Sequence, residues 1–282
     1  MKKNKIFISL VGAGGKMGNQ ITNNLKNRDE YITYYCEKSK QGIENLREKE
    51  LSNSTLREAI PKSNYIILAV PDTKIKVVSK DVVPLMKKGS ALILLDPAAA
   101  YANEVSMRDD CTFIVTHPCH PPIFGEQDTE EARNDLFGGI AAKQDIVIAL
   151  VQGEENKLEE AETICMNMFA PVEESHRITV DQMAMLEPAA AEVVAASAAC
   201  LMKEAIDEVI KRGVPEKAAW AFMLGHIQIP LAIVLKNSNP FSDAAKIAID
   251  YGNQKIYKDN WREVFEKPAI SEVIDKMLHS DS

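Results

Sequence analysis

The chain has 282 residues, of which 46% are hydrophobic and 26% charged, and its formal net charge at pH 7 is -8. This is the composition of a soluble globular protein, and the length is sufficient for two ordinary domains. The acidic excess argues against nucleic acid or an anionic membrane as the main partner, because either favours a basic surface. A small-molecule substrate fits this charge better.

The N-terminal segment and the cysteines indicate the compartment. The stretch "MKKNKIFISLVGAGG" lacks the long apolar centre and the cleavage site of a secretion signal. Unbroken apolar runs fall short of the ~20 residues that a membrane-spanning helix needs. The five cysteines are widely spaced and form no CxxC pair, which argues against a disulfide framework. We therefore expect a cytoplasmic protein without a membrane partner.

The first half of the chain alternates short β-rich runs with amphipathic segments, the pattern of parallel strands joined by crossover helices. Strands are expected at 5–12, 31–37, 64–72, 90–97 and 111–118, with one or two more within 140–153. Helices are expected at 15–27 and 73–86. The fold class predicted is α/β, with a Rossmann-type, mostly parallel sheet domain over residues 1–153.

The second half, residues 154–282, is rich in Ala, Glu, Lys, Met and Leu at helical spacing, and only 170–179 reads as extended. A long helix is expected over 191–213, because Gly213 and Pro215 form a good C-terminal signal. Its alanine-rich middle would allow another helix to pack closely, including one from a second subunit. We predict a mostly α-helical C-terminal domain that binds substrate and forms a homodimer.

The stretch "VGAGGKMG" lies between the first expected strand and the first expected helix. Its best register is GxxGxxG, a turn whose backbone N–H groups can approach a pyrophosphate at a helix N-terminus. An acidic residue, Glu37, ends the second strand, as a dinucleotide site requires. Glu37 favours NAD because it repels a 2′-phosphate, although "KSK" (38–40) could hold that phosphate. The expected cofactor-binding residues are Gly12, Ala13, Gly14, Gly15, Lys16, Met17, Glu37, Val70 and Pro71.

The stretch "THPCHPPIFG" (116–125) follows the strand expected at 111–118. In an open α/β sheet a ligand lies outside the carboxyl ends of the strands, so His117 and His120 should lie near the nicotinamide. Imidazole titrates near neutral pH and can take the proton of a hydroxyl during hydride transfer. The two histidines could instead bind a divalent metal, with Cys119 as a soft third ligand, or only cap a rigid loop.

Two other charged residues are candidates. Glu187 precedes Pro188 within "MAMLEPAAAE", where a helix must begin or kink, so it is either a functional acid or a carboxylate at a helix N-terminus. Lys143 and Gln144 interrupt the apolar run "IAAKQDIVIAL". They could reach a substrate carboxylate or hydroxyl, or lie on a strand edge that faces solvent. We take His117 and Lys143 as the candidate catalytic pair.

Several longer motifs resemble one enzyme family. The glycine turn, the strand ending "ILAVPD" and the helical second half resemble the 6-phosphogluconate dehydrogenase and ketol-acid reductoisomerase group. The phrases "THPCHPPIFG", "GGIAAKQDIVIALVQG", "FAPVEESHRITVDQMAMLEPA" and "GHIQIPLAIV" resemble the D-apionate oxidoisomerase family within it. Together these phrases extend along most of the chain.

The resemblance implies NAD-linked oxidation of a branched sugar acid, followed by migration of a carbon from C3 to C2 to give a 3-oxo acid. A divalent ion such as Zn or Mg would stabilise the charge that develops on neighbouring oxygens. On this basis His120 and Glu187 are the expected metal ligands, with His117 as base or third ligand. The alternatives are a simple NAD(P)-dependent hydroxyacid dehydrogenase, without rearrangement, and a non-catalytic NAD(H)-sensing protein.

Overall fold

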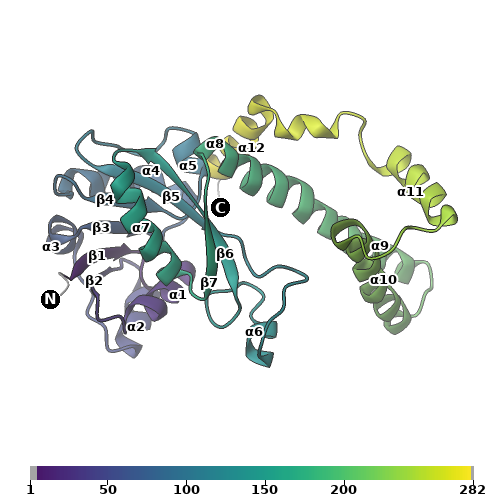
Figure 1. Ribbon diagram of the computed structural model, residues 1–282, viewed down its shortest axis with the longest axis horizontal. Coiled ribbons are helices and arrows are strands. Elements are labelled where there is room, and N and C mark those ends of the chain that lie inside the picture. The colour runs from purple at the N-terminus through teal and green to yellow at the C-terminus, as the bar shows by residue number, and fades with distance from the viewer. Residues whose placement is uncertain (1–4, 281–282) are drawn as a thin grey trace. The chain divides into compact units, whose positions relative to one another are not determined.

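The computed structural model describes residues 5–280 and contains two compact units (Figure 1). The first unit comprises the chain up to Glu187 together with the C-terminal segment from Ser271. The second unit is Pro188–Ile270. Each unit is considered separately below.

The first unit is built on a seven-stranded sheet in the order β2-β1-β3-β4-β5-β6-β7. Its strands are β1 (Ile6–Val11), β2 (Tyr31–Cys36), β3 (Tyr65–Leu68), β4 (Ala91–Leu94), β5 (Thr112–Pro118), β6 (Gln144–Gln152) and β7 (Val172–Arg177). Every neighbouring pair is parallel except β5 and β6, which run antiparallel. The Rossmann-type, mostly parallel sheet that was predicted is therefore confirmed.

Helices connect the strands of this unit. They are α1 (Lys16–Leu25), α2 (Lys40–Glu48), α3 (Leu56–Ala59), α4 (Asp72–Val82), α5 (Ala98–Tyr101), α6 (Glu130–Asn134), α7 (Glu155–Met168) and α8 (Val180–Ala184), and most of α12 (Lys267–His279) joins them. Short 3-10 turns, η1 (Ile60–Lys62) and η2 (Val83–Leu85), extend α3 and α4. The predicted helix at 15–27 corresponds to α1, and the one at 73–86 corresponds to α4 with η2.

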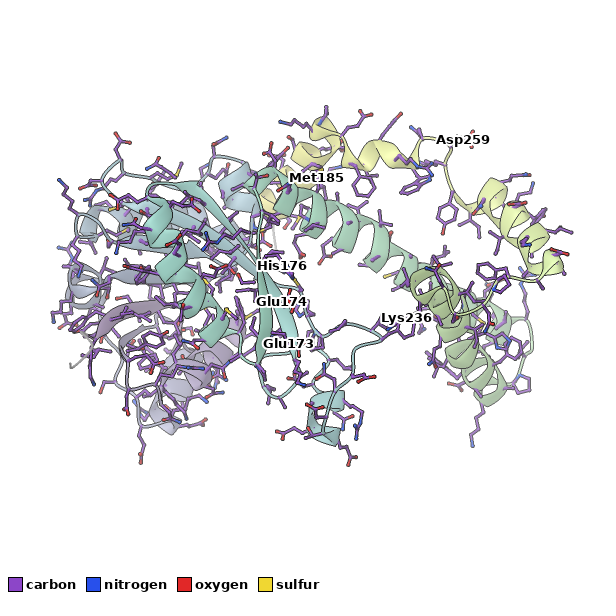
Figure 2. All side chains as sticks on the ribbon, in the orientation of Figure 1. Glu173, Glu174, His176, Met185, Lys236 and Asp259 are labelled. Carbon is purple, nitrogen blue, oxygen red and sulfur yellow. The ribbon has the colours of Figure 1, made fainter. Side chains whose placement is uncertain are left out.

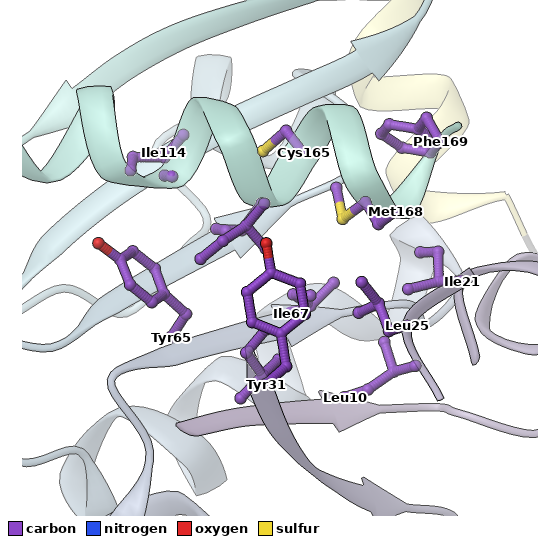
Figure 3. Close-up of a cluster of buried hydrophobic side chains, with 14 of the residues drawn as sticks. Leu10, Ile21, Leu25, Tyr31, Tyr65, Ile67, Ile114, Cys165, Met168 and Phe169 are labelled. Carbon is purple, nitrogen blue, oxygen red and sulfur yellow. The ribbon is translucent and has the colours of Figure 1, made fainter. Parts of the chain in front are cut away.

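The core of the first unit lies between the sheet and the helices α1 and α7 (Figure 3). Leu10 and Ile67 from the strands meet Leu25 of α1 and Met168 of α7, and all four are almost completely buried. Such burial stabilises each side chain by about 1.5–3 kcal/mol relative to exposure. This packing fixes the carboxyl ends of the strands, where the candidate site residues lie.

The boundary between the units differs from the expected one at 153/154. Helix α7 packs on the sheet, and β7 pairs with β6 over Gln144–Ile148 and Val172–Arg177, so residues 154–187 belong to the sheet unit. The extended segment expected at 170–179 is β7, and it completes the sheet by hydrogen bonding. The amino-acid composition becomes typical of helices from residue 154 onward. The hydrogen bonds between β6 and β7 nevertheless keep β7 in the first unit.

The second unit is entirely helical among the residues described. It holds most of the π-helical segment η3 (Met185–Ala196), followed by α9 (Ser197–Lys211), α10 (Glu216–Lys236), α11 (Asp243–Ile256) and the 3-10 turn η4 (Trp261–Phe265). The long helix expected over 191–213 corresponds to η3 and α9, and the predicted helical C-terminal domain is confirmed.

Two helices have the length and composition to cross a membrane. The sequence prediction missed them because it considered only unbroken runs of apolar residues. They span Val180–Lys211, with hydropathy 1.4, and Glu216–Lys236, with hydropathy 1.7. In each helix the most apolar stretch of 18 residues is largely exposed, with only 11% buried in the first helix and 6% in the second. The same exposure is typical of a helix that packs against a partner protein.

Candidate functional site

The glycine turn after β1 lets the backbone pass closely by its neighbours. Gly12 has a φ of +82°, and its N–H donates to the carbonyl oxygen of Cys36 over 2.8 Å. A Cβ at Gly12 would collide with the carbonyl oxygen of Ala69, and one at Gly18 would collide with the carbonyl oxygen of Gly12. The turn ends at Gly15, the N-cap of α1, whose free N–H groups can bind a phosphate.

Glu37 lies beside this turn at the end of β2. Its carboxylate accepts hydrogen bonds from the N–H groups of Gly14 at 3.0 Å, Lys38 at 2.8 Å and Ser39 at 2.9 Å. Burial raises the pKa of Glu37, but these backbone donors outweigh it and hold the pKa below its ordinary value. The carboxylate is therefore ionised at neutral pH and positioned to accept from a ribose hydroxyl.

A cavity of about 400 Å³ opens next to Glu37. Its walls include Val11, Asn53, Arg57 and Val70, and Pro71 follows as the N-cap of α4. Lys16 and Met17 line a second cavity on the far side of the turn, of about 210 Å³. The expected cofactor-binding residues thus lie around the carboxyl ends of β1, β2 and β3, as a dinucleotide site requires.

The side chains of His117, Glu187 and Asp96 form a cluster beyond the end of β5. Each offers a ligand atom, and these atoms all lie within 4.8 Å of one another. The Nε2 atom of His117 is 3.4 Å from an oxygen of Glu187, and its Nδ1 atom is 4.0 Å from an oxygen of Asp96. The three side chains are half-buried, so the cluster is accessible to a small ligand.

The hydrogen bonding of His117 determines which ring nitrogen carries a proton. Its Nδ1 atom lies 2.9 Å from the carbonyl oxygen of Leu95, which can only accept. The hydrogen is therefore on Nδ1, and in the neutral ring the lone pair is on Nε2, facing Glu187. A proton or a cation between Nε2 and the carboxylate would relieve the repulsion between these two acceptors.

Asp72, the first residue of α4, is electrostatically coupled to the cluster. The pKa of its carboxyl is raised from 3.8 to about 6, mainly by burial and also by the negative charge of Asp96, while His117 opposes the shift. Acids whose pKa is raised in this way are frequent in functional sites. The shift also shows that the end of β4 and the start of α4 share one electrostatic environment with His117.

Helix geometry positions Glu187 next to His117. Pro188 has no backbone N–H, and the helix from α8 continues through it as the π-helical segment η3. A π-helical turn is rare and often occurs at functional sites. The expected break at Glu187 is therefore a widened helical turn, and it holds the carboxylate at the cluster.

The structure separates the other candidates from this cluster. His120 lies beyond the strand with a φ of +61°, and its Nδ1 atom is 2.8 Å from the carbonyl oxygen of Phe137. Glu187 is thus paired with His117, whereas His120 was the expected metal partner. Because β5 continues to Pro118, it carries His117 to the cluster, whereas the left-handed turn directs His120 to the loop before β6.

Lys143 lies outside the cluster as well. Its ammonium is 2.7 Å from Asp128 and 3.9 Å from Glu173, and the side chain is 40% exposed. This is the solvent-facing alternative considered for Lys143, since two surface carboxylates hold its charge. Its neighbour Gln144 differs, because that side chain is buried.

Asp96 and Asp72 were not singled out as site residues in the sequence. Each lies just past a buried strand, in "LLDP" and "AVPD", and the carboxyl ends of parallel strands meet at one edge of the sheet. Both residues could have been identified from the sequence as acidic residues next to a proline at the end of a buried strand. Asp96 also accepts from the N–H of Ala98, which orients its carboxylate.

A second group of ionisable side chains lies on the surface of β6 and β7. The Nε2 atom of His176 is 2.9 Å from a carboxylate oxygen of Asp145, and Glu174 is the third member. Figure 2 shows Glu174 and His176 on the same strand, β7. Both are exposed, so the group is a solvated ion pair at the sheet edge.

Two family models match the chain. Residues 1–146 match the acetohydroxy acid isomeroreductase NADPH-binding domain. Residues 125–278 match the C-terminal domain of decarboxylating phosphogluconate dehydrogenase. Both matches agree with a dinucleotide-binding sheet followed by helices.

Proteins of similar sequence are described more specifically. A D-apionate oxidoisomerase of Blautia hydrogenotrophica is 42% identical over 281 residues, which cover 98% of each chain. One of Pectobacterium atrosepticum is 44% identical over 276 residues, 98% of this chain and 96% of the relative. A Cupriavidus necator protein, solved with calcium and NAD and described as a semialdehyde dehydrogenase NAD-binding protein, has a TM-score of 0.93 at 41% identity, covering 97% and 99% of the two chains.

Proposed function

The chain belongs to the D-apionate oxidoisomerase family, and on that premise we propose that it oxidises D-apionate with NAD and rearranges the carbon skeleton to a 3-oxo acid. Four curated relatives at 41% to 44% identity confirm the family that the sequence motifs predicted. The chain is accordingly an oxidoreductase with a dinucleotide-binding domain.

The observation that carries the proposal is the position of His117 at the edge of the sheet where the dinucleotide turn lies. Its Nδ1–H is engaged by Leu95, so Nε2 is available as a proton acceptor. In the first step the C2 hydroxyl gives its proton to Nε2 while its C–H hydride passes to the nicotinamide. The carboxylate of Glu187, 3.4 Å away, stabilises the imidazolium that forms.

The second step moves one carbon from C3 to C2 and involves no net oxidation or reduction. The C3 hydroxyl loses its proton as a C3 substituent migrates to C2, and the former C2 carbonyl oxygen becomes a hydroxyl. Asp72 is suited to proton transfer here, since its raised pKa of about 6 lies near working pH. The product is a ketone at C3 with no net change in redox state during this step.

A divalent cation fits the cluster. Carboxylate oxygens from Asp96 and Glu187 suit Mg²⁺, and an imidazole whose other nitrogen donates to a backbone carbonyl is typical of a Zn²⁺ ligand. When bound, such an ion would supply Lewis-acid stabilisation of the two neighbouring substrate oxygens. We assign the cation to Asp96 and Glu187 and the proton transfer to His117.

NAD is the proposed oxidant, in preference to NADP. Glu37 is ionised and lies where the adenosine ribose would bind, so a 2′-phosphate would be repelled. Lys38, which could neutralise that phosphate, lies 3.8 Å from Asp81, and its side chain is 82% exposed. The carboxylate therefore dominates this end of the cavity.

Two copies of the chain are proposed to pair through the helical unit, in the cytoplasm and without nucleic acid or membrane. Helix α10 exposes large apolar side chains along its length, and an apolar surface of this extent is costly in water. These side chains are Phe222, Leu224, Ile229, Val234 and Leu235. A second copy supplies the same kind of apolar surface, and two identical patches pair in a twofold dimer.

Product analysis tests the proposed reaction. Purified enzyme is incubated with ¹³C-labelled D-apionate and NAD, and carbon connectivity is followed by NMR while NADH is followed by absorbance. We expect NADH and a 3-oxo acid with a rearranged skeleton. NADH with an intact skeleton would instead identify a simple hydroxyacid dehydrogenase, and NADH binding without turnover would identify a cofactor sensor.

A further inference from the structure

A small cavity between the start of α1 and His120 has no role in the mechanism above. It measures about 210 Å³ and is bounded by Lys16 and Met17 of α1, by His120 after β5, and by Phe137 and Gln144 before and at the start of β6. The His120 ring centroid is 6.2 Å from that of His117. The cavity wall therefore includes the imidazole ring that neighbours the proposed base, His117.

Gln144 lines this cavity and carries a buried hydrogen-bond acceptor. The side chain is 2% exposed, and its Nε2 donates to the carbonyl oxygen of Phe169 over 2.8 Å. This contact fixes the amide orientation, because a flipped amide would bring two oxygens together. Its Oε1 has no hydrogen-bond partner within residues 5–280. A buried acceptor without a donor is costly, so a ligand donor is expected there.

A glycine packs directly against this amide. Gly138 has a φ of +75°, and a Cβ there would lie 2.6 Å from Gln144 Oε1. The carbonyl oxygen of Gly138 accepts from Gln20 Nε2 over 2.6 Å, which holds the loop in place. The amide can therefore take this position only beside a glycine, at a backbone conformation that other residues rarely adopt.

Lys16 adds a positive charge to the same cavity. Its Nζ atom lies 5.4 Å from the centroid of the Phe137 ring, which holds the ammonium at the cavity wall. No carboxylate pairs with Lys16 in the part of the chain that the structure describes, 5–280. A cation without a protein partner beside a neutral acceptor is complementary to a hydroxylated anion.

We propose that this cavity binds the carboxylate end of the sugar acid, with Lys16 pairing with the carboxylate and Gln144 Oε1 accepting from a hydroxyl that is not oxidised. This inference rests on the proposed function and names the residues that select its substrate. A neutral sugar lacks the anion that Lys16 recognises, and a deoxy acid would leave Gln144 unpaired. Sites of this kind discriminate strongly against analogues that lack the hydrogen-bonding group.

The test measures steady-state kinetics with D-apionate and NAD for Lys16→Met, Lys16→Arg and Gln144→Met. We expect Lys16→Met to raise KM for the acid by ~10- to 100-fold, the loss typical of a charged hydrogen bond. Lys16→Arg should recover most of this loss because it keeps the charge. Gln144→Met should reduce the preference for D-apionate over an analogue that lacks one hydroxyl. KM for NAD and NADH binding by fluorescence should stay near the wild-type values in Gln144→Met. In Lys16→Met, KM for the acid should rise more than KM for NAD, because Lys16 also lies at the start of the helix that follows the glycine turn.

Exposed residues outside the cavity provide matched controls. Lys26→Met, at the other end of α1, and Gln41→Met, on α2, should leave both KM values unchanged. Wild-type KM for the acid in Lys16→Met would overturn the inference, and so would a rise confined to KM for NAD, which would assign the cavity to the cofactor. A wild-type enzyme that does not turn over D-apionate would refute the proposed function instead. Because Lys16 is exposed, its variants keep the test valid even if Gln144→Met fails to fold.

Discussion

The Nε2 atom of His117 lies 3.4 Å from a carboxylate oxygen of Glu187, which joins the end of β5 to the start of the π-helical segment. A proton or a cation between the two atoms would relieve the repulsion between the imidazole lone pair and the carboxylate. The contact thus brings together two residues that are 70 positions apart in the sequence, as 187 minus 117 gives. It is the basis of the first two predictions.

Replacement of His117 by Asn should lower kcat by ~10²- to 10⁴-fold, the usual contribution of a general base. Binding of NADH, measured by fluorescence, should remain, since His117 is assigned to the substrate hydroxyl and not to the cofactor. His176→Asn is the control, because His176 is an exposed histidine in a surface ion pair. Full activity of His117→Asn would remove this residue from the mechanism.

Replacement of Glu187 by Gln should weaken the binding of a divalent cation. Titration of chelator-treated protein with Mg²⁺, Mn²⁺ and Zn²⁺ by calorimetry measures the effect, and affinity should fall at least ~10-fold with the lost carboxylate. Glu192→Gln is the control, since Glu192 is exposed. His117→Asn should keep its cation, so loss of the ion in that variant would make the imidazole a ligand and not the base. Wild-type protein that is active after chelation would argue against any metal.

Asp72 should make stability depend on pH in a predictable direction. Its pKa is raised to about 6 in the folded protein, so the folded state binds more protons than the unfolded state between its ordinary value of 3.8 and about 6. Stability therefore falls as pH rises through this window, and the loss is complete above it. Asp72→Asn removes this penalty and should be more stable than wild type near pH 8 by about 1–2 kcal/mol, after allowance for solvent screening.

Most of the difference between Asp72→Asn and wild type should be lost near pH 4, because it disappears fully only below the ordinary value of 3.8, where Asp72 is protonated in both states. Urea unfolding of chelator-treated protein at the two pH values measures this change. Asp29→Asn, at an exposed position, should show no such dependence. A variant that is less stable than wild type near pH 8 would contradict the assigned sign.

Replacement of Glu37 by Gln should reduce the preference for NAD over NADP. The change keeps the side-chain length but removes the charge that repels a 2′-phosphate, so the ratio of kcat/KM for the two cofactors should fall by ~10-fold or more. Glu48→Gln, on the exposed surface of α2, serves as the control. An unchanged ratio would mean that Glu37 has no part in cofactor selection.

A charge on the exposed apolar surface of α10 should weaken the proposed dimer. Ile229 is 58% exposed in the chain, and Ile229→Asp would bury a carboxylate in the interface, which should raise the dissociation constant by about 100-fold. Analytical ultracentrifugation measures the mass. Val77→Asp, at a 60% exposed position on α4, should leave the dimer intact. A wild-type protein that is monomeric at micromolar concentration would refute the dimer.

The local part of the site was predictable from sequence. Apolar runs of strand length located β1 to β6, and the glycine motif located the turn after β1 that Glu37 lies beside, because both depend on residues close in the chain. Polar residues within apolar surroundings identified His117, Glu187 and Gln144 as unusual. These features follow from backbone geometry and burial, which short stretches of sequence specify.

Which residues meet was decided by the tertiary structure. The pairing of Glu187 with His117 and not with His120 depends on how far β5 extends and on the left-handed turn at His120. Lys143 faces surface carboxylates because β6 begins one residue later. Asp96 and Asp72 joined the site only because parallel strands bring their carboxyl ends to one edge of the sheet. Such contacts arise between segments distant in sequence, where packing and hydrogen bonding of the whole sheet set the distances.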